Sequence, residues 1–264
     1  MAGRERPRRE VRKVLFVDIS GTVTDRTNAA GRKVDPEAIR LLAEYAKARG
    51  VHRVFFITAL PAKTLLRGNE NVLPFLRQNG IDGISEIWCE NGAYKLEGGR
   101  PVMSPEANAF LKERKSIAGV LDAELSRRQK KAENASGSAG YLVQLRYDLT
   151  ANAPNRRKYG RLAGALNKTL EMAGLDARVR AHTSYTGVFV RPTAIDKGRR
   201  AFQLRWGLQE GRARPPRITG KAFGDARSDR TMAGGNIKFV KVDGTEHFKR
   251  LLAGWMPKTR PARG

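Results

Sequence analysis

The feature that most constrains the fold is a short apolar run that ends in an acid. Residues 11–18 contain Val, Leu and Phe with little alternation and end at Asp18, a pattern typical of a strand buried on both faces of a parallel sheet. Residues 35–50 predict a helix, because Asp35 is a good N-cap and a glycine ends the apolar periodicity. A second buried strand is expected over residues 51–58. Strand, helix and strand in this order predict a right-handed parallel crossover.

The patterning divides the rest of the chain into two kinds of structure. Residues 91–192 combine alternating strand patterns with an amphipathic helix over residues 156–173, which predicts an antiparallel sheet with helices on one side. The α/β rhythm returns after this block. We therefore expect an α/β fold, with a doubly wound, mainly parallel core made of residues 13–90 and 193–257. Residues 91–192 would be an inserted α+β cap domain.

Within the inserted block the expected elements are specific enough to test. The block is expected to contain a hairpin over 93–102, a helix over 105–131, a loop over 134–140, and strands over 141–149, 177–181 and 185–191.

The charge of the chain is unusual for its length of 264 residues. There are 51 Lys and Arg against 26 Asp and Glu, a formal net charge of +25, which attracts polyanions. Part of this charge lies in residues 1–12 and 258–264, which we expect to be basic disordered tails, and the rest lies in dispersed Lys and Arg. Because no RNP-type, zinc-finger or basic-zipper pattern accompanies the charge, a charged surface is favoured. Nucleic-acid binding stays open as an alternative.

Several classes of protein are excluded by composition. Cys89 is the only cysteine, so an intrachain disulfide and a cysteine-based metal site are both impossible. No apolar run approaches the ~18 residues of a membrane-spanning helix. The basic N-terminus is not followed by the apolar stretch of a signal peptide. We expect a cytoplasmic protein with no membrane partner.

The first chemical motif is Asp18-Ile19-Ser20-Gly21-Thr22, directly after the first strand. In open α/β sheets, ligands bind beyond the carboxyl ends of the strands. Gly21 permits a tight turn whose backbone N–H groups can bind phosphate oxygens. The alternative is that Asp18 only caps the end of the strand.

Two single residues stand at comparable positions. Thr58 ends the second strand, where its hydroxyl can donate a hydrogen bond to a phosphoryl oxygen. Lys197 opens a helix after an extended segment, where its ammonium can neutralise a carboxylate and a phosphoryl group. Each residue type is common, so neither position is specific alone.

The last motif is Gly224-Asp225, with Asp229 four positions later. Two carboxylates here and one at Asp18 would form a cluster of hard oxygen ligands suited to Mg²⁺. The alternative is a pair of surface acids that cap a short helix from Ser228.

Together, the order of these motifs resembles the haloacid dehalogenase superfamily of phosphohydrolases, over about residues 13–256. The stretches Cys89–Ala93 and Thr183–Gly198 are similar to the subgroup with a large cap between the second and third motifs. That subgroup includes phosphatases of sucrose phosphate and mannosyl-3-phosphoglycerate, and phosphomannomutases.

The resemblance implies a role for each motif residue. Asp18 looks like the nucleophile that forms an aspartyl phosphate, and Thr58 and Lys197 look like the phosphate clamp. The implied Mg²⁺ ligands are Asp18, the backbone carbonyl of Ser20, Asp225 and, in the outer shell or through water, Asp229. The implied substrate contacts are Ser20, Gly21, Thr22, Asn91 and Arg191.

Ser20 departs from the family pattern, because phosphatases of this kind usually have an acid/base Asp there. Loss of such a group typically costs ~10²–10⁴-fold in rate. The enzyme would then be slow and favour good leaving groups, or a side chain of the cap would replace the acid, or the site would bind a phosphorylated ligand without turnover. Ser228 is a second departure, since Asn is common before the last Asp.

The leading hypothesis is a Mg²⁺-dependent phosphatase acting on a small phosphorylated metabolite, a sugar phosphate. The alternatives are a nucleic-acid-associated phosphatase or binding protein, and a non-catalytic protein that binds a phosphorylated ligand. The isolated histidines are expected to be structural or at the surface; they are His52, His182 and His247. Two arginines near the motif ends, Arg191 and Arg227, are candidates for contacts with an anion.

Overall fold

The computed structural model describes most of the chain in seven segments. They are residues 9–24, 33–67, 71–127, 132–137, 140–149, 156–183 and 187–256. Several predictions fall outside them and are not tested: residues 1–8 and 258–264 of the basic tails, the helix end at 128–131, and the residues Ser184 and Tyr185.

The chain forms two compact units. The first unit consists of Met1–Thr58, Asn69–Ile87 and Lys197–Gly264, and the second of Ala59–Gly68 and Trp88–Asp196. Each unit is described by itself below.

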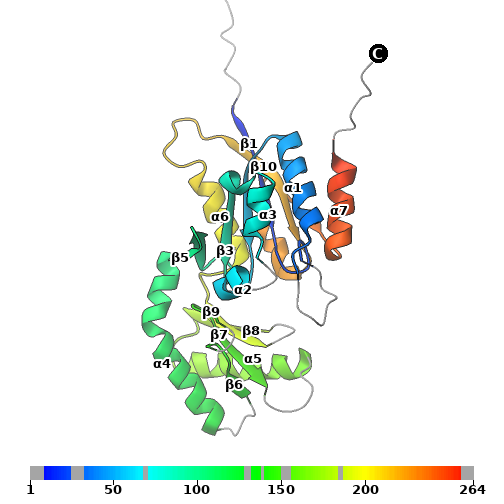
Figure 1. The fold of residues 1–264 in the computed structure, drawn as a ribbon. Coiled ribbons are helices and arrows are strands. Elements are labelled where there is room, and N and C mark those ends of the chain that lie inside the picture. Colours follow the sequence, from blue (N-terminus) through cyan, green and yellow to red (C-terminus); the bar gives the residue numbers. More distant parts are fainter. Residues whose placement is uncertain are drawn as a thin grey trace, which may run out of the picture. The chain divides into compact units, whose positions relative to one another are not determined.

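The larger sheet has seven strands in the order β11-β10-β1-β2-β3-β4-β5 (Figure 1). Its pairs β1–β2, β1–β10 and β10–β11 are parallel, whereas β3–β4 and β4–β5 are antiparallel. The strands are β1 Val11–Val17, β2 Val51–Ile57, β3 Ser85–Cys89, β4 Tyr94–Glu97, β5 Arg100–Met103, β10 Arg217–Gly224 and β11 Ile237–Lys241. The expected mainly parallel α/β sheet is confirmed.

Helices connect these strands where the sequence predicts them. In α1, Asp35 accepts hydrogen bonds from the backbone N–H groups of Glu37 and Ala38, and Gly50 ends the helix with a φ of 59°. The residue ranges are α1 Pro36–Arg49, α2 Ala62–Arg67, α3 Leu73–Gln78, α6 Lys197–Gly207 and α7 Gly244–Trp255, with 3₁₀ turns η1 Asp82–Ile84 and η2 Arg227–Met232. The helices α1 and α7 pack on each other, and α6 packs on η2.

The core of the first unit is centred on β1. Residues 14–17 are buried on both faces of the strand, which explains why their sequence does not alternate. Phe16 stacks on Phe55 of β2 with ring centroids 5.2 Å apart. Phe223 of β10 meets Phe248 of α7 edge to face at 5.1 Å. Burial of each such ring contributes about 1.5–3 kcal/mol.

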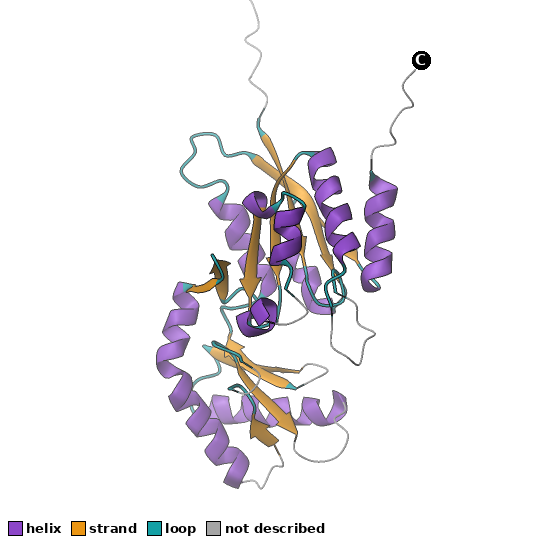
Figure 2. Ribbon diagram, in the orientation of Figure 1, coloured by secondary structure: helices purple, strands orange, loops and turns teal. Residues whose placement is uncertain are grey.

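The second unit contains an antiparallel sheet of four strands in the order β6-β7-β9-β8. Figure 2 draws the strands in orange and the helices in purple. The helices α4 Pro105–Arg127 and α5 Arg156–Met172 contact this sheet. The strands are β6 Ala132–Asn134, β7 Leu145–Leu149, β8 Val179–Thr183 and β9 Val188–Pro192. The expected α+β insertion with an antiparallel sheet is therefore present.

Some boundaries in this unit were predicted wrongly. The strand expected over 141–149 begins at Leu145, because the backbone N–H groups of residues 142–144 donate to Glu90 instead of to a strand. Asn134, expected in a loop, belongs to β6. The strand expected from 177 begins at Val179, because residues 176–178 form a turn.

Among the described residues, no helix is both long enough and apolar enough to cross a membrane.

Candidate active site

The first motif lies at the end of the central strand of the parallel part of the sheet. Asp18 directly follows β1, and its backbone N–H donates to the carbonyl of Phe223 in β10 at 2.9 Å. Thr58 directly follows β2 and is fully buried. Because β10, β1 and β2 are parallel neighbours, their carboxyl ends meet at one edge of the sheet. That edge is where an open α/β sheet binds ligands.

A tight turn follows Asp18. Gly21 has a φ of 73°, in the left-handed region that favours glycine. The N–H of Gly21 donates a hydrogen bond to Thr24 Oγ1 at 3.2 Å. The N–H groups of residues 22–24 all donate to the carbonyl oxygen of Ile19. These groups are thus bonded within the turn, and their contact with a phosphate stays a prediction. The buried hydroxyl of Thr22 has no hydrogen-bond partner among the described residues.

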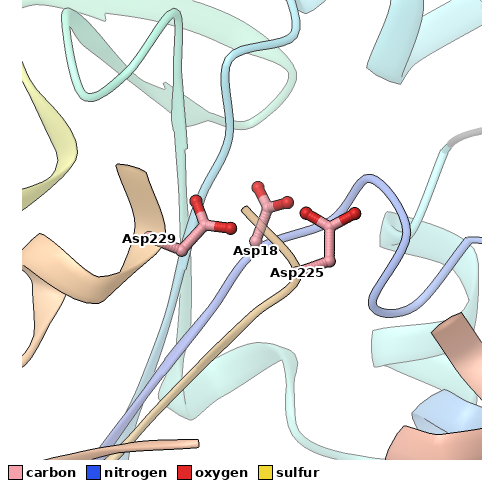
Figure 3. A group of neighbouring side chains, drawn as sticks. All are labelled: Asp18, Asp225 and Asp229. Atoms are coloured by element: carbon pink, nitrogen blue, oxygen red, sulfur yellow. The ribbon is translucent and has the colours of Figure 1, made fainter. Parts of the chain in front are cut away.

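Three carboxylates gather at this edge. Asp18, Asp225 and Asp229 each offer one oxygen, and these oxygens lie within 4.8 Å of one another (Figure 3). Asp225 follows β10 and is half-buried, whereas Asp18 and Asp229 are buried. Asp18 is distant in the sequence from Asp225 and Asp229, so their grouping is a product of the fold. Hard oxygen donors in a cluster of this kind fit a Mg²⁺ ion.

Lys197 joins two of these acids. Its Nζ donates to Asp18 Oδ1 and to Asp229 Oδ1, both at 2.6 Å, and its side chain is buried. Three carboxylates and one ammonium leave the cluster net negative. A divalent cation would balance that charge.

Two glycines, whose role was not anticipated from the sequence, allow this close packing. A Cβ atom on Gly198 would lie 2.7 Å from the carbonyl oxygen of Thr231, so glycine lets the start of α6 approach η2 and brings Lys197 to Asp229. A Cβ atom on Gly224 would lie 2.2 Å from Asp229 Cβ. Spacing alone does not reveal such contacts.

Asp229 also has a structural role. Its Oδ2 accepts a hydrogen bond from the backbone N–H of Ala226 at 2.9 Å, at the start of η2. The alternative interpretation, an acid that caps a short helix, is thus correct for one oxygen. The other oxygen faces Lys197.

Burial and charge set the ionisation of the cluster. Burial is the main effect that raises the pKa of Asp18, Lys197 opposes it and the neighbouring Asp229 adds to it, and the resulting pKa is about 6. Burial alone would lower the pKa of Lys197, but the two carboxylates outweigh it and raise that pKa above its ordinary value. At neutral pH the ammonium is retained and Asp18 is largely ionised.

Two predicted substrate residues belong to the second unit. Asn91 is buried, has a φ of 64°, and its Nδ2 lies 3.4 Å from Gln144 Oε1. Arg191 is half-buried on β9, and its Nε has no hydrogen-bond partner among the described residues. Burial lowers the pKa of Arg191, against the opposing charge of Asp196.

Glu90 is a residue whose role the sequence did not reveal. Its carboxylate accepts hydrogen bonds from the backbone N–H groups of residues 142–144 at 2.6–2.9 Å, and from the Tyr94 hydroxyl at 3.1 Å. The Tyr94 hydroxyl in turn accepts from the N–H of Ala62. Glu90 therefore fixes three segments of the second unit. A buried acid in a Glu-Asn-Gly turn was the only signal, and it does not name the partners.

The histidines stand apart from the acid cluster. His52 is exposed, and His247 Nδ1 accepts from the N–H of Asp243. His182 is half-buried on β8, where burial first and then the charges of Arg191 and Arg180 lower its pKa to about 4. Arg227 is exposed at the start of η2.

Neither a protein-family model nor a curated protein sequence matches the chain. Solved structures do. A trehalose-6-phosphate phosphatase related protein shares 14% sequence identity at a TM-score of 0.55, covering 91% of this chain and 96% of that one. The trehalose-6-phosphate phosphatase of Aspergillus fumigatus shares 17% sequence identity at a TM-score of 0.57, covering 92% of this chain and 93% of that one. This chain has the fold of the haloacid dehalogenase-like phosphatases. The IMP-nucleotidase of Plasmodium falciparum gives 12% identity, a TM-score of 0.62, and coverage of 95% of this chain but 62% of that one.

Identities this low establish the fold alone, because one fold can carry several activities. Within this haloacid dehalogenase-like fold, the acid cluster and Lys197 are the features that indicate a reaction at the end of β1. The subgroup defined by its cap is not established by these similarities.

Proposed function

We propose that this protein is a Mg²⁺-dependent phosphatase that hydrolyses a phosphomonoester of a small metabolite through an aspartyl phosphate on Asp18. The observation that carries the proposal is the buried carboxylate of Asp18, which shares a cluster with Asp225 and Asp229 and is bonded to Lys197 at 2.6 Å. Perturbed and coupled groups of this kind are typical of catalytic sites.

The cluster fits Mg²⁺ by the chemistry of its donors. Asp18, Asp225 and Asp229 would hold the ion together with the backbone carbonyl of Ser20. When bound, Mg²⁺ neutralises charge on the phosphoryl oxygens, and charge stabilisation dominates the catalysis of phosphoryl transfer.

The residues of the chain supply the remaining steps. An oxygen of Asp18 attacks phosphorus, an O–P bond forms, and the bond to the ester oxygen breaks, so that the alcohol leaves with a proton from solvent. Water then cleaves the aspartyl phosphate and restores the carboxylate. Lys197 orients Asp18 and keeps it ionised, and Lys197 and the buried Thr58 hydroxyl are the proposed clamp on the phosphoryl oxygens.

Ser20 sets the expected substrate preference. A serine hydroxyl cannot act as a general acid near neutral pH, so the leaving group receives no proton from this position. We therefore propose slow turnover of ordinary phosphomonoesters and faster turnover where the leaving group is already good, as in an acyl phosphate.

The proposed substrate is a small sugar phosphate. The similar structures include two proteins named for trehalose 6-phosphate and one for IMP, which supports a small phosphorylated compound. We further propose that residues 91–192 form a specificity-determining cap and that Asn91 and Arg191 contact the substrate there. The unpartnered Nε of Arg191 supports a contact with an anion.

The test is a phosphatase panel with Mg²⁺ on trehalose 6-phosphate, glucose 6-phosphate, IMP, acetyl phosphate and p-nitrophenyl phosphate. The variants are Asp18→Asn and Ser20→Asp. The matched control is Asp82→Asn, which makes the same change at an exposed acid of the first unit. Mass spectrometry of acid-quenched samples looks for a phosphoryl adduct on the peptide that contains Asp18.

We expect activity that requires Mg²⁺, is lost in Asp18→Asn, rises in Ser20→Asp and is unchanged in Asp82→Asn. Activity that survives Asp18→Asn would refute the nucleophile. Tight binding of a phosphorylated compound without turnover in either the wild type or Ser20→Asp would instead favour a phospholigand-binding protein.

A further inference from the structure

Helix α6 carries an exposed pair of aromatic side chains. Phe202 and Trp206 are 57% and 59% exposed, although both are large and apolar. Their rings are stacked, with centroids 6.4 Å apart and planes 20° from parallel. Among the large hydrophobic side chains that the described residues expose, these two are the only Phe and Trp.

Folding of the helix does not account for this pair. The buried side of α6 is formed by Lys197 and Ala201, whereas Phe202 and Trp206 are four residues apart and therefore share one face. Covering either ring would remove more apolar surface from water and stabilise the protein. Single exposed apolar residues are ordinary, but two rings already stacked on each other form a preorganised planar surface.

The surroundings of the pair are strongly basic. The guanidinium of Arg205 lies 5.8 Å from the centre of the Phe202 ring. Residues 199–217 contain six arginines and one acid, Glu210, and Arg212 is paired with Glu10 at 3.3 Å. The arginines are Arg199, Arg200, Arg205, Arg212, Arg214 and Arg217, all exposed or half-buried.

We propose that this surface, called here the α6 surface and made of Phe202, Trp206 and the arginines just named, binds single-stranded nucleic acid. Unpaired bases stack on exposed aromatic rings, and arginines contact the phosphates that follow along the strand. The aromatic pair is what distinguishes this partner from others. An acidic peptide would use the charge but not two stacked rings, and a duplex hides the faces of its bases. The proposal is independent of the phosphatase reaction.

The test uses the full chain and a fluorescein-labelled oligouridylate of about 12 nucleotides, a length within the range of known single-strand sites. Anisotropy titrations at several salt concentrations give the affinity and its salt slope. In Phe202→Ala/Trp206→Ala we expect the affinity to fall about five-fold or more for each base that loses its ring. The salt slope should stay unchanged, because phosphate contacts determine it.

Further variants separate stacking from charge. Trp206→Phe keeps a ring and should bind nearly as the wild type does. Arg214→Gln should reduce the salt slope by about 0.7. Met172→Ala is the matched control, because it removes a side chain that is 69% exposed on α5, and it should change neither quantity. The far-UV circular dichroism spectrum should be unchanged in the aromatic variants, which shows that they are folded.

Wild-type affinity in the double alanine variant would overturn the proposal and assign any binding to the net charge alone. Equal affinity for the oligouridylate and for a duplex with the same number of phosphates would overturn it as well. Self-association that is lost in the double variant while oligonucleotide binding is retained would identify a protein interface instead.

Discussion

Replacing Lys197 by methionine tests the electrostatics of the site most directly. The side chain is buried and makes two charge-assisted hydrogen bonds of 2.6 Å, to Asp18 and Asp229. Methionine keeps much of the apolar volume but removes the ammonium. The two buried carboxylates would then repel each other without a counter-charge. Removal of one partner from a buried ion pair typically costs about 3–5 kcal/mol, so we expect a loss of that size in the metal-free protein.

The same substitution should abolish phosphatase activity. The pKa of Asp18, already raised to about 6 by burial, would rise further without Lys197, and the nucleophile would be protonated in neutral buffer. Urea unfolding with a chelator measures the loss of stability, and the same titration with Mg²⁺ should recover part of it, because a ligand that binds only the folded state stabilises it.

A second variant tests whether the loss of stability is caused by a buried carboxylate left without a counter-charge. Asp18→Asn/Lys197→Met should be more stable than Lys197→Met alone, because the double change removes one of the uncompensated carboxylates. Lys241→Met, at an exposed lysine of the same unit, is the matched control and should leave stability nearly unchanged. A wild-type urea midpoint for Lys197→Met in chelator, or strictly additive effects in the double variant, would refute the reasoning.

Three further changes follow from single contacts. Glu90→Gln turns an amide N–H towards at least one of the backbone donors of residues 142–144, so we expect a loss of about 1–3 kcal/mol and faster amide exchange at those residues. Gly224→Ala places a Cβ 2.2 Å from Asp229 Cβ, so the thermal shift on adding Mg²⁺ should shrink. His182 has a folded-state pKa of about 4 against an ordinary 6.5. Its contribution to stability is therefore present above pH 6.5 and is lost as the pH falls towards 4, and in His182→Gln the urea midpoint should depend less on pH across that interval.

Matched substitutions accompany these three. Glu171→Gln and His52→Gln change exposed residues, and Gly254→Ala adds a Cβ atom with nothing within 4 Å. Wild-type rates of amide exchange at residues 142–144 would contradict the prediction for Glu90→Gln. A thermal shift with Mg²⁺ as large as that of the wild type would contradict the prediction for Gly224→Ala. The prediction for His182→Gln fails if its urea midpoint depends on pH as strongly as that of the wild type.

Features determined by neighbouring residues were predictable from the sequence. Helix α1 has its cap and its terminal glycine at the ends of an apolar periodicity, and β1 is a run with no alternation, so local patterns specify both. The grouping of Asp18 with Asp225 and Asp229 followed from one topological rule, that parallel strands bring their carboxyl ends to the same edge.

Features that depend on contacts between distant segments were not predictable. Glu90 binds a stretch of backbone some 50 residues later, and backbone N–H groups carry no sequence signature. The approach of Gly198 to Thr231 is likewise invisible in spacing. The exposure of the stacked rings of Phe202 and Trp206 was not predictable either, because no sequence pattern shows that one face of a helix is left uncovered.

The double attachment of Lys197 has a consequence for how the protein matures. An ammonium held between two carboxylates is a permanent internal counter-ion, so the acidic residues can be assembled during folding before any divalent cation arrives. If the cluster binds Mg²⁺ as proposed, folding and metal loading would be separate events, and a chain made where Mg²⁺ is scarce would still reach a shape that is ready to accept it.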